Sequence, residues 1–426
     1  MAVATCTGGS VYHAAGVLAQ TGHSLRRSAQ RLNQEADWMS KRRLRIAVLN
    51  RQFSVTGGGA ERYSIALVEK LAEQHDIHVF AQQIDHHWPG VTYHRVSRPI
   101  SRPRWLNQLW YATATWWATR KGFDVVHSHE NTWHGNVQTM HVPPVKYNLF
   151  HGKSGVALGV RWLKVLTSPR LLVYLWLEWR RLYMFRLRSI VATSGSLLSQ
   201  TIEVYPDCRS GIQVLPPGVD LVPGAAEADQ KSMARQRLGL PLTGRCVLMV
   251  GNDYRKKGLL ALLGAMSQLP TNCYLAVVGN PSQIPQFKAL TKVPELKNRV
   301  FFLGSRKEMN DVYSAADCLA HPTLEDTFAM VVLEAMAHGL PVVVSDEKYC
   351  GISALLAHEV DALLLENPTI SGALANSIKR VLEDGPLHER LVKNGMAFAN
   401  NHRWKDVGDG YNKIYNAIAN QTRKCQ

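Results

Sequence analysis

The sequence predicts an α/β protein with two doubly wound, Rossmann-like domains and a cleft between them. Short apolar runs, each followed by a segment of helical apolar spacing, form two series along the chain. A stretch rich in small and polar residues, at 221–245, separates the two series. Such apolar runs are typical of parallel strands that are buried on both faces. Because ligands bind these sheets at the carboxyl ends of the strands, the cleft is the predicted site.

The runs that predict strands lie in both halves of the chain. In the first half they are 44–50, 77–80, 91–96, 124–129, 137–142, 189–193 and 211–215. In the second half they are 246–250, 273–278, 300–303, 318–320 and 342–344. We therefore expect a first domain over 44–220, a second over 221–401 and a final helix at 402–424. Residues 1–43 show neither strand periodicity nor a clean signal peptide, and we expect a disordered extension or a start codon assigned too early there.

The composition predicts a cytoplasmic protein with a partner of opposite charge. The 426 residues carry 49 Lys and Arg against 33 Asp and Glu, a net charge of +16. The seven cysteines are widely spaced without any C-x-x-C pair, as is usual for free thiols in a reducing compartment. No apolar run approaches the ~20 residues that a membrane-spanning helix needs, so we do not expect an integral membrane protein.

Much of the positive charge lies between residues 101 and 200, which hold 13 Lys and Arg, 3 Asp and Glu, and eight of the eleven Trp. Within this region, 102–121 and 161–188 combine cations with Trp, Tyr and Leu. Helices of this composition lie at the headgroup level of a bilayer. We expect an anionic membrane surface as partner, at the inner face of the plasma membrane, with a purely structural face as the alternative. Nucleic acid is not expected, because no recognised nucleic-acid module is present.

A glycine-rich loop, Gly57 to Gly59, follows the first predicted strand and leads into a helix predicted at 60–73. A strand, a glycine turn and a helix N-terminus together form an anion-binding arrangement, although a tight turn alone would also explain the glycines. The loop is not a dinucleotide fingerprint, because Arg62 stands where the last glycine would be.

The loop after the first strand of the second half carries three consecutive cations, Arg255, Lys256 and Lys257. Cations are unfavourable next to the N-terminus of a helix unless an anion joins them. A bound diphosphate would satisfy all three, whereas a solvated run of charges is the alternative.

Two acidic residues, Asp326 and Glu334, stand eight positions apart at the start of another helix, predicted at 327–338. At about 1.5 Å per residue they are separated by about 10 Å along the axis, roughly the distance from a ribose across a diphosphate to a sugar. The free N–H groups of the first helical turn lie between them and suit phosphate. A capping Asp and a merely solvated Glu are the alternative interpretation.

This pair resembles the Glu-x7-Glu signature of the retaining GT-B glycosyltransferases of family 4, with Asp326 at the first position. Thr139-Met140-His141 is similar to the Thr-x-His of that family, and Pro216 to Asp220 to its Pro-x-Gly-Val-Asp. The run from Val250 to Gly258 and the basic aromatic region look most like lipopolysaccharide core glucosyltransferases. The resemblance extends from about residue 44 to the C-terminus. It implies that the helix at 402–424 crosses back to the first domain.

The resemblance also implies catalytic roles. Asp326 would contact hydroxyls of the transferred sugar, His141 would face the reacting sugar, and Glu334 would hold the ribose of the nucleotide. Lys257 would bind the donor diphosphate. Asn252 stands where the family usually has Arg, and Arg255 or Lys256 would substitute. The donor site would be completed by Gly58, Gly59 and the backbone of Phe328, Ala329, Met330 and Val331, with Ala329 where a Gly is common.

We therefore expect a retaining hexosyltransferase that moves a hexose, in the first instance glucose from UDP-glucose, to a lipid-anchored glycan such as lipopolysaccharide core or an exopolysaccharide. The chain has no D-x-D triplet, the usual metal motif of the other glycosyltransferase fold, so neither a metal nor a cofactor is expected. Three alternatives stay open: a GDP-mannose-dependent mannosyltransferase, a nucleotide-sugar epimerase of the same fold, and a non-catalytic basic scaffold that binds membranes.

Overall fold

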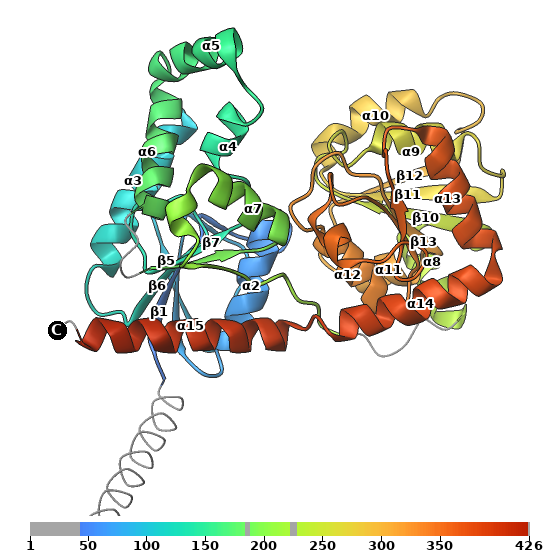
Figure 1. Cartoon of the computed structure of the whole chain (residues 1–426). Helices are drawn as coiled ribbons and strands as arrows, with labels where there is room; N and C mark the ends of the chain where they lie inside the picture. The colour runs from blue at the N-terminus through green and yellow to red at the C-terminus, as the bar shows by residue number, and fades with distance from the viewer. Residues whose placement is uncertain (1–42, 184–187, 222–227, 425–426) are drawn as a thin grey trace, which may run out of the picture. The chain divides into compact units, whose positions relative to one another are not determined.

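The computed structural model describes residues 43–183, 188–221 and 228–424 (Figure 1). The disordered extension expected over 1–43 therefore lies outside the described residues, apart from residue 43. Two parallel sheets, one in each half of the chain, organise the described residues. None of the helices in these three ranges is long and apolar enough to cross a bilayer.

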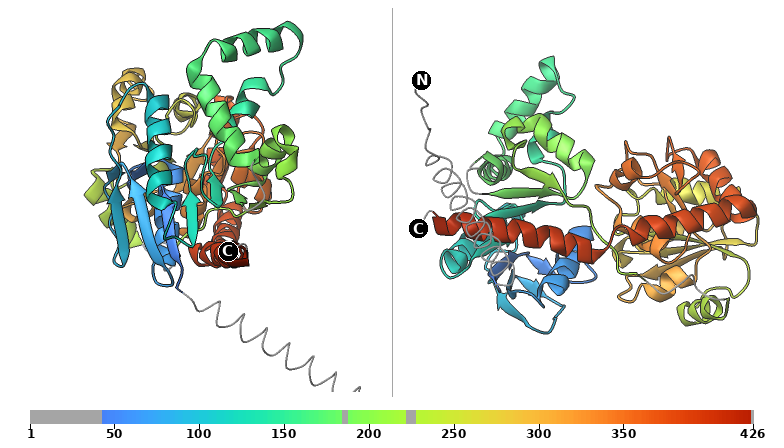
Figure 2. Two further views of the ribbon diagram at one scale, coloured as in Figure 1. Left: turned by 90° about the vertical axis from the view of Figure 1, so that its left-hand side faces the viewer. Right: turned by 60° about the horizontal axis from the view of Figure 1, so that its bottom comes forward.

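The first sheet has seven strands in the order β5-β3-β1-β6-β7-β8-β9, and all neighbouring strands are parallel. The strand order reverses between β1 and β6, as in a doubly wound sheet, and helices cover both faces (Figures 1 and 2). All seven strands predicted for this half are confirmed. Their bounds are β1 (Arg45–Leu49), β3 (Asp76–Ala81), β5 (Val91–Arg95), β6 (Val125–Ser128), β7 (Val137–Met140), β8 (Ser189–Ala192) and β9 (Ile212–Val214); β2 (Gln52–Phe53) and β4 (Gln83–Ile84) form a separate pair.

The basic segment 161–188 contains parts of two helices, because α5 begins at Gly155 and ends at Leu166. Pro169 then starts α6, since its ring nitrogen has no N–H to donate and is tolerated only in a first turn. The helices are α2 (Gly59–Leu71), α3 (Arg104–Thr119), α4 (Val145–Phe150), α5 (Gly155–Leu166), α6 (Pro169–Tyr183) and α7 (Gly195–Val204), with a 3-10 turn η1 (Pro206–Cys208).

The second sheet has six parallel strands in the order β12-β11-β10-β13-β14-β15. The five predicted strands are confirmed, and β15 was not predicted. The central strands β13 and β14 are buried along their whole length, which explains their apolar sequences. The bounds are β10 (Arg245–Val250), β11 (Cys273–Val278), β12 (Val300–Gly304), β13 (Cys318–His321), β14 (Val342–Ser345) and β15 (Leu363–Leu365).

The helix predicted at 327–338 begins later, at Met330. Ala329 has a φ of +67°, in the left-handed region, and therefore cannot belong to the helix. The helices of this half are α8 (Ala228–Leu238), α9 (Leu259–Met266), α10 (Ile284–Leu290), α11 (Asn310–Ser314), α12 (Met330–Ala337), α13 (Ser371–Glu383) and α14 (Gly385–Asn400), with 3-10 turns η2 (Pro281–Gln283) and η3 (Gly351–Leu355).

The last helix, α15 (Trp404–Lys424), packs against the first half of the molecule, as the resemblance implied. It lies beside α2 and β6, whereas α14, which precedes it, lies against α12 of the second half (Figures 1 and 2). Its buried tyrosines reach the sheet: Tyr415 shares a hydrogen bond of 2.7 Å with His127, and Tyr411 one of 2.6 Å with Thr139. The final helix thus supports the strands that end at the site.

Candidate active site

A cavity of about 780 Å³ lies at the carboxyl ends of strands from both sheets. The glycine loop after β1 and His141 after β7 line it from the first half, and the loops after β10 and β13 line it from the second half. A hydrogen bond of 3.1 Å, from the Asn252 side-chain amide to the Gly57 carbonyl oxygen, joins the two sets of loops. Cavities of roughly 300–1,000 Å³ hold small-molecule ligands, so this cavity has room for one.

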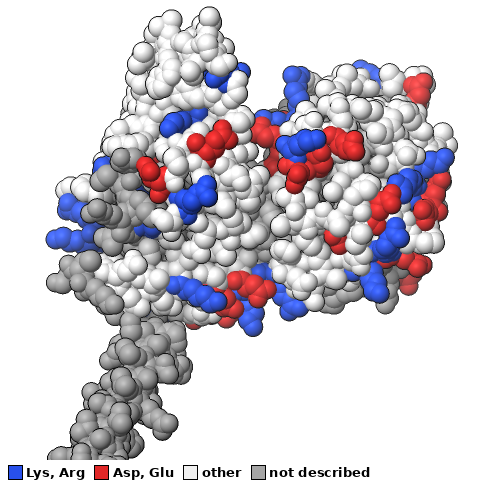
Figure 3. Space-filling model, viewed as in Figure 1, with Lys and Arg blue, Asp and Glu red and all other residues white. Residues whose placement is uncertain are grey.

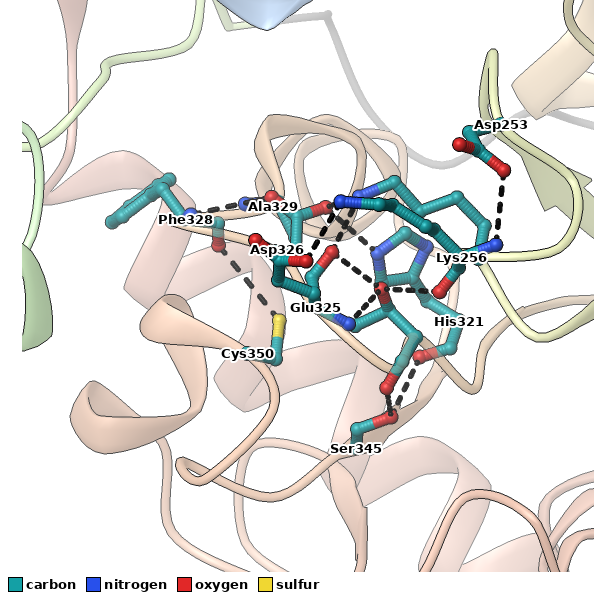
Figure 4. A network of polar contacts seen from close by, with 11 residues as sticks. Asp253, Lys256, His321, Glu325, Asp326, Phe328, Ala329, Ser345 and Cys350 are labelled. Carbon is teal, nitrogen blue, oxygen red and sulfur yellow. Dashed lines mark hydrogen bonds and ion pairs between the residues drawn. The ribbon is translucent and has the colours of Figure 1, made fainter. Parts of the chain in front are cut away.

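The carboxylate of Asp326 is the centre of a polar network in this cavity (Figure 4). Its Oδ2 accepts hydrogen bonds from Lys257 Nζ at 2.6 Å and from His321 Nε2 at 3.1 Å. Its Oδ1 accepts from the backbone N–H groups of Phe328 at 3.3 Å and Ala329 at 2.9 Å. Burial raises the pKa of the Asp326 carboxyl, but the bond from His321 and the charge of Lys257 together hold that pKa well below its usual range. Asp326 is therefore ionised, with its direction fixed by four donors.

His321 was missed by the sequence reasoning. It is the last residue of β13 and is completely buried, and burial lowers the pKa of its imidazole although the bond to Asp326 opposes this. Its Nδ1 has no hydrogen-bond partner within the described part of the chain. The signal that could have found it is its position, because polar residues at the carboxyl ends of parallel strands face the ligand.

Lys257 reaches Asp326 because Gly258 lets two loops touch. Gly258 has a φ of +77°, and a Cβ built on it would lie 1.9 Å from the carbonyl oxygen of Pro322. Only glycine fits this left-handed conformation at such a close approach. The loop after β10 thereby packs directly on the loop after β13.

The other cations of this loop have different surroundings. Lys256 lines the cavity at its exposed edge, where its Nζ pairs with Glu325 Oε2 at 2.7 Å (Figure 4). Arg255 is exposed and is not among the residues that line the cavity, so its part in the donor site stays a prediction. The turn, in which the Gly258 N–H donates to the Arg255 carbonyl oxygen at 3.2 Å, directs the lysines to the cavity and Arg255 to solvent. Arg306, directly after β12, lines the cavity instead.

The glycine loop contributes backbone on the opposite wall, where Gly58 and Gly59 both line the cavity. Gly58 is the N-cap of α2 and offers no side chain to the first turn. The side chain of Glu61 lies beside this turn: burial raises the pKa of its carboxyl, while hydrogen bonds from its own backbone and from Gly58 oppose the rise. Some first-turn donors of α2 are therefore satisfied by Glu61 itself, and contact with a donor phosphate stays a prediction.

The start of α12 is where the sequence predicted backbone N–H groups for the nucleotide-sugar donor, and the N–H groups of Phe328 and Ala329 already donate to Asp326 there. Phe328, Ala329, Met330 and Val331 all line the cavity. The left-handed φ of Ala329 explains why a glycine is common at this position, since a residue with a Cβ carries a strain of roughly 1–2 kcal/mol there. The first N–H groups of a helix have no acceptor within it and attract anions, so this wall suits a phosphate.

Glu334 does not line the cavity, whereas its hydrogen-bond partner Arg62 does. Its Oε1 accepts a hydrogen bond from Arg62 Nη2 at 2.6 Å, and its Oε2 accepts one from the Tyr313 hydroxyl at 2.5 Å. Since α12 begins at Met330, Glu334 is about one turn inside the helix rather than two. Arg62 and Tyr313 were not predicted as site residues.

His141 lines the cavity at the end of β7 and is held by a second histidine. Its Nε2 shares a hydrogen bond of 2.9 Å with Nδ1 of His129, and the two rings stack. Burial, together with the charge of Arg181, lowers the pKa of His141 to about 3, and burial also lowers the pKa of His129 well below its usual value. Both imidazoles are therefore neutral near pH 7, and His141, which lines the cavity, can exchange a hydrogen bond with a sugar hydroxyl without adding charge.

The described residues contain no cluster of three His, Cys, Asp or Glu side chains that could hold a metal ion. The cysteines among them, Cys208, Cys246, Cys273, Cys318 and Cys350, are buried free thiols. The adjacent pair His86 and His87 is also not part of a metal-binding cluster in these ranges.

Two family models match the chain, and together they cover most of it. The model described as Glycosyltransferase Family 4 matches residues 57–222, and the one described as Glycosyl transferases group 1 matches residues 230–398. The region matched by the first model contains the glycine loop and His141. The region matched by the second contains Lys257, Asp326 and Glu334.

Among curated proteins, a D-inositol 3-phosphate glycosyltransferase of Xylanimonas cellulosilytica is 28% identical over 243 residues, which are 53% of this chain and 58% of that protein. The lipopolysaccharide glucosyltransferase WaaG of Escherichia coli strain K12 is 29% identical over 195 residues, 44% of this chain and 51% of that protein. The matched region thus spans only about half the length of these relatives.

Solved structures share the fold over a longer range. The crystal structure of WaaG, a glycosyltransferase involved in lipopolysaccharide biosynthesis, has a TM-score of 0.75 at 20% identity and covers 87% of this chain and 99% of that one. The structure of Anabaena HepE in complex with UDP and glucose has a TM-score of 0.67 at 20% identity, with 87% and 99% covered. With both halves matched by glycosyltransferase models and the cavity placed between two Rossmann-like sheets, the chain belongs to the GT-B glycosyltransferases, and within them it is most like the lipopolysaccharide core glucosyltransferases.

Proposed function

We propose that this protein is a retaining hexosyltransferase that moves glucose from UDP-glucose to a lipid-anchored glycan, such as lipopolysaccharide core, at an anionic membrane surface. The observation that carries the proposal is the contact of Lys257 with Asp326 in a cavity that also reaches His141. A cation, an ionised carboxylate and a neutral imidazole are the groups that a sugar diphosphate and its reacting sugar need. The similarity to WaaG and to HepE, which binds UDP and glucose, supports this choice of donor.

The proposed reaction breaks the bond between the anomeric carbon and the diphosphate oxygen, and the diphosphate leaves with the electron pair. Lys257 and the first N–H groups of α12 stabilise the charge that develops on it, because they are fixed in place before the reaction. The acceptor hydroxyl attacks from the same face, and a donor phosphate oxygen takes its proton. Asp326 and His141 orient the sugar and are not nucleophiles. None of these steps needs a metal.

The proposed membrane surface lies on α3, α5 and α6. In α5 the side chains of Val156 and Leu163 are 85% and 63% exposed, and the helix contains Arg161 and Lys164 but no acidic residue. Figure 3 shows α5, at the top of the view, as a surface with little charge and no acidic side chain on the visible face. Exposed apolar residues bordered by cations suit a bilayer interface that carries negative charge. The exposed apolar side chains of these three helices include Trp110, Trp116, Trp117, Val160, Trp162, Leu166, Leu172, Trp176 and Trp179.

The buried face of α6 connects this surface to the acceptor side of the cavity. Glu178 accepts hydrogen bonds from the backbone N–H groups of Val145 and Lys146 at the start of α4. Arg181 donates to the carbonyl oxygen of Thr139, two residues before His141, at 2.6 Å. A glycan on a lipid that meets α5 and α6 would therefore enter beside His141.

A nucleotide panel tests the donor assignment. We expect UDP to raise the melting temperature with or without magnesium, because a ligand that binds only the folded state stabilises it. Glu334→Ala should abolish this shift, whereas Asp326→Asn should keep UDP binding and lower turnover. A shift with GDP alone would replace UDP-glucose by a mannosyl-type donor. No shift with UDP, GDP or ADP would contradict the enzyme proposal and favour a scaffold.

An acceptor-free reaction separates transfer from epimerisation. A transferase consumes UDP-glucose only when an acceptor is present, apart from slow hydrolysis. A nucleotide-sugar epimerase of the same fold would form product from the donor alone, and that result would contradict the proposed transfer.

A further inference from the structure

An ion pair between Arg62 and Glu334 joins the two halves of the molecule. Arg62 lies in the first turns of α2, and Glu334 lies on α12, 272 positions later in the chain. Their Nη2 and Oε1 atoms are 2.6 Å apart, and the side chains are 31% and 11% exposed. Arg62 lines the cavity, as do Met330 and Val331 on the same helix as Glu334.

The carboxylate of Glu334 is held from two sides. Arg62 occupies one site on Oε1, and the hydroxyl of buried Tyr313 occupies one site on Oε2. A carboxylate offers about four acceptor positions, so roughly two remain for other donors. The two hydroxyls of a ribose match this number.

The opposite charges of Arg62 and Glu334 stabilise the contact between the two side chains. The negative charge of Glu334 raises the pKa of Arg62 although burial opposes the rise, so the guanidinium stays protonated. A buried carboxylate is strongly destabilising when its partner is removed, because an unpaired charge remains. Arg62 thus holds the Glu334 carboxylate in one orientation through the contact of 2.6 Å.

The glycine loop places Arg62 at this point. The Arg62 N–H donates to the carbonyl oxygen of Gly58 at 3.2 Å, within the first turn of α2. The carbonyl oxygen of Gly57, directly before it, accepts from Asn252 of the second half. Two adjacent contacts therefore tie the glycine loop to the loops that we assign to the donor.

We propose that Arg62 is a positioning residue for the donor: it holds Glu334, from the other half of the molecule, in the orientation that receives the ribose. This inference rests on the proposed function. Nucleotide binding then depends on both halves, although the contacts to the nucleotide come from the second half. Arg62 acts through Glu334 and touches no reacting atom.

A matched ion pair distinguishes positioning from general stabilisation. Arg380 Nη2 and Glu359 Oε1 are also 2.6 Å apart, and both side chains are 40% exposed. Neither residue lines the cavity. Arg380→Ala thus removes an ion pair between the same atom types at the same distance, away from the site.

The test is calorimetric titration of the full chain with UDP, for the wild type, Arg62→Ala, Arg62→Lys, Glu334→Gln and the double variant Arg62→Ala with Glu334→Gln. We expect Arg62→Ala to weaken UDP binding at least tenfold, about 1.4 kcal/mol, and Arg62→Lys to recover part of the loss. Arg62→Ala should have no further effect when Glu334 is already Gln, because the two residues act as one unit. Arg380→Ala should leave UDP affinity unchanged.

Three results would overturn the inference. The first is UDP binding by Arg62→Ala that equals that of the wild type, and the second is an equal weakening by Arg62→Ala in the Glu334→Gln background. Tighter binding by Arg62→Ala would show that Arg62 blocks Glu334 and must be displaced by the ribose. A wild type that binds no nucleotide at all would instead refute the proposed function on which the inference rests.

Discussion

The proposed donor side of the cavity, around Lys257 and Asp326, and its proposed acceptor side, around His141, are built from opposite kinds of chemistry. On the donor side, charged side chains meet in direct contact, as Lys257 with Asp326 and Arg62 with Glu334. Around His141 the contact is between neutral groups, and His141 is held by His129 rather than by an acid. This difference indicates that the charge of the reaction is handled on one side only, while the other side positions hydroxyl groups.

The pKa values support the same division. The pKa of Asp326 lies well below its usual range because of His321 and Lys257, which outweigh burial, whereas burial lowers the pKa of His141 to about 3. A group with a pKa near 3 is a poor general base at pH 7. His141 is therefore suited to orient the reacting sugar and not to take the acceptor proton.

We expect the largest effect on activity when the positive charge of Lys257 is removed. Lys257→Ala should lower kcat/KM by about 10²–10³, the usual cost of losing one preorganised group that stabilises transition-state charge. Steady-state kinetics with a saturating acceptor would measure this. Lys379→Ala, which removes an exposed lysine on α13 that lies 3.9 Å from Glu383, is the control for loss of a positive charge. Activity within threefold of the wild type in Lys257→Ala would contradict the donor assignment.

The next effect, on stability, is expected at Gly258, whose close contact with Pro322 positions Lys257. Gly258→Ala should lower the free energy of unfolding by about 2–4 kcal/mol, since the new Cβ would meet the Pro322 carbonyl oxygen in a left-handed backbone conformation. Urea titration measures this change. Gly195→Ala, where nothing lies within 4 Å of an added Cβ and φ is ordinary, should change stability by less than about 1 kcal/mol. Equal effects of the two substitutions would refute the close-approach argument.

The proposed membrane surface can be changed without touching the cavity. The double variant Val160→Asp with Leu163→Asp adds two negative charges to the exposed face of α5 and should reduce binding to phosphatidylglycerol vesicles about tenfold or more. Cosedimentation measures the bound fraction. Val293→Asp, at an exposed apolar position of the second half, is the matched control. Unchanged vesicle binding by the α5 variant would remove α5 from the membrane surface.

A pH dependence of stability is also expected from buried histidines of the first half. His127, His134 and His141 each have a pKa lowered to about 3 by burial, while an unfolded histidine titrates near 6.5. Below about pH 6.5 the unfolded chain binds more protons than the folded one, so stability falls as the pH falls. Each histidine contributes at most about 1.4 kcal/mol per pH unit between roughly pH 6.5 and 3.

Urea unfolding at pH 7.5, 6.5 and 5.5 would measure this slope. His134→Gln should make it shallower, and His87→Gln, at an exposed position, serves as the control. The lowered pKa of Asp326 adds to acid sensitivity only below its unfolded value near 3.9, so it does not contribute in this window. A stability that stays constant from pH 7.5 to 5.5 would contradict the burial of neutral imidazoles.

Much of the fold could be predicted because buried parallel strands have continuous apolar sequences. The runs at 246–250 and 342–344, for example, became β10 and β14. β15 was missed because its three leucines form too short a run to be recognised without the neighbouring strand β14. The start of α12 could not be predicted, since tertiary contacts fix the preceding loop: the Asp326 N–H donates to the Tyr349 carbonyl oxygen at 2.8 Å, and Gly351 donates to that of Asp326 at 3.0 Å.

The site was predictable where a motif is local in the sequence. Lys257 and Asp326 follow strand ends, and the structure brings them into contact. In the sequence, Arg62 stood out only as the residue that breaks a dinucleotide fingerprint. Its role as a partner was not visible, because Glu334 is 272 positions away, on helix α12 of the second half. Arg255 was predicted together with the two lysines because a sequence shows that three cations are adjacent but not which of them a turn directs to solvent; in the structure Arg255 is exposed and does not line the cavity.

The most direct test of the central claim is a transfer reaction. The purified protein is incubated in EDTA with UDP-glucose and a truncated lipopolysaccharide core in anionic vesicles, and the acceptor is analysed by mass spectrometry and NMR. We predict a mass gain of one glucose residue with an α-linkage, the configuration of the donor, and no gain with Lys257→Ala. An inverted linkage, a strict need for a divalent metal, or loss of UDP-glucose without modified acceptor would contradict the account.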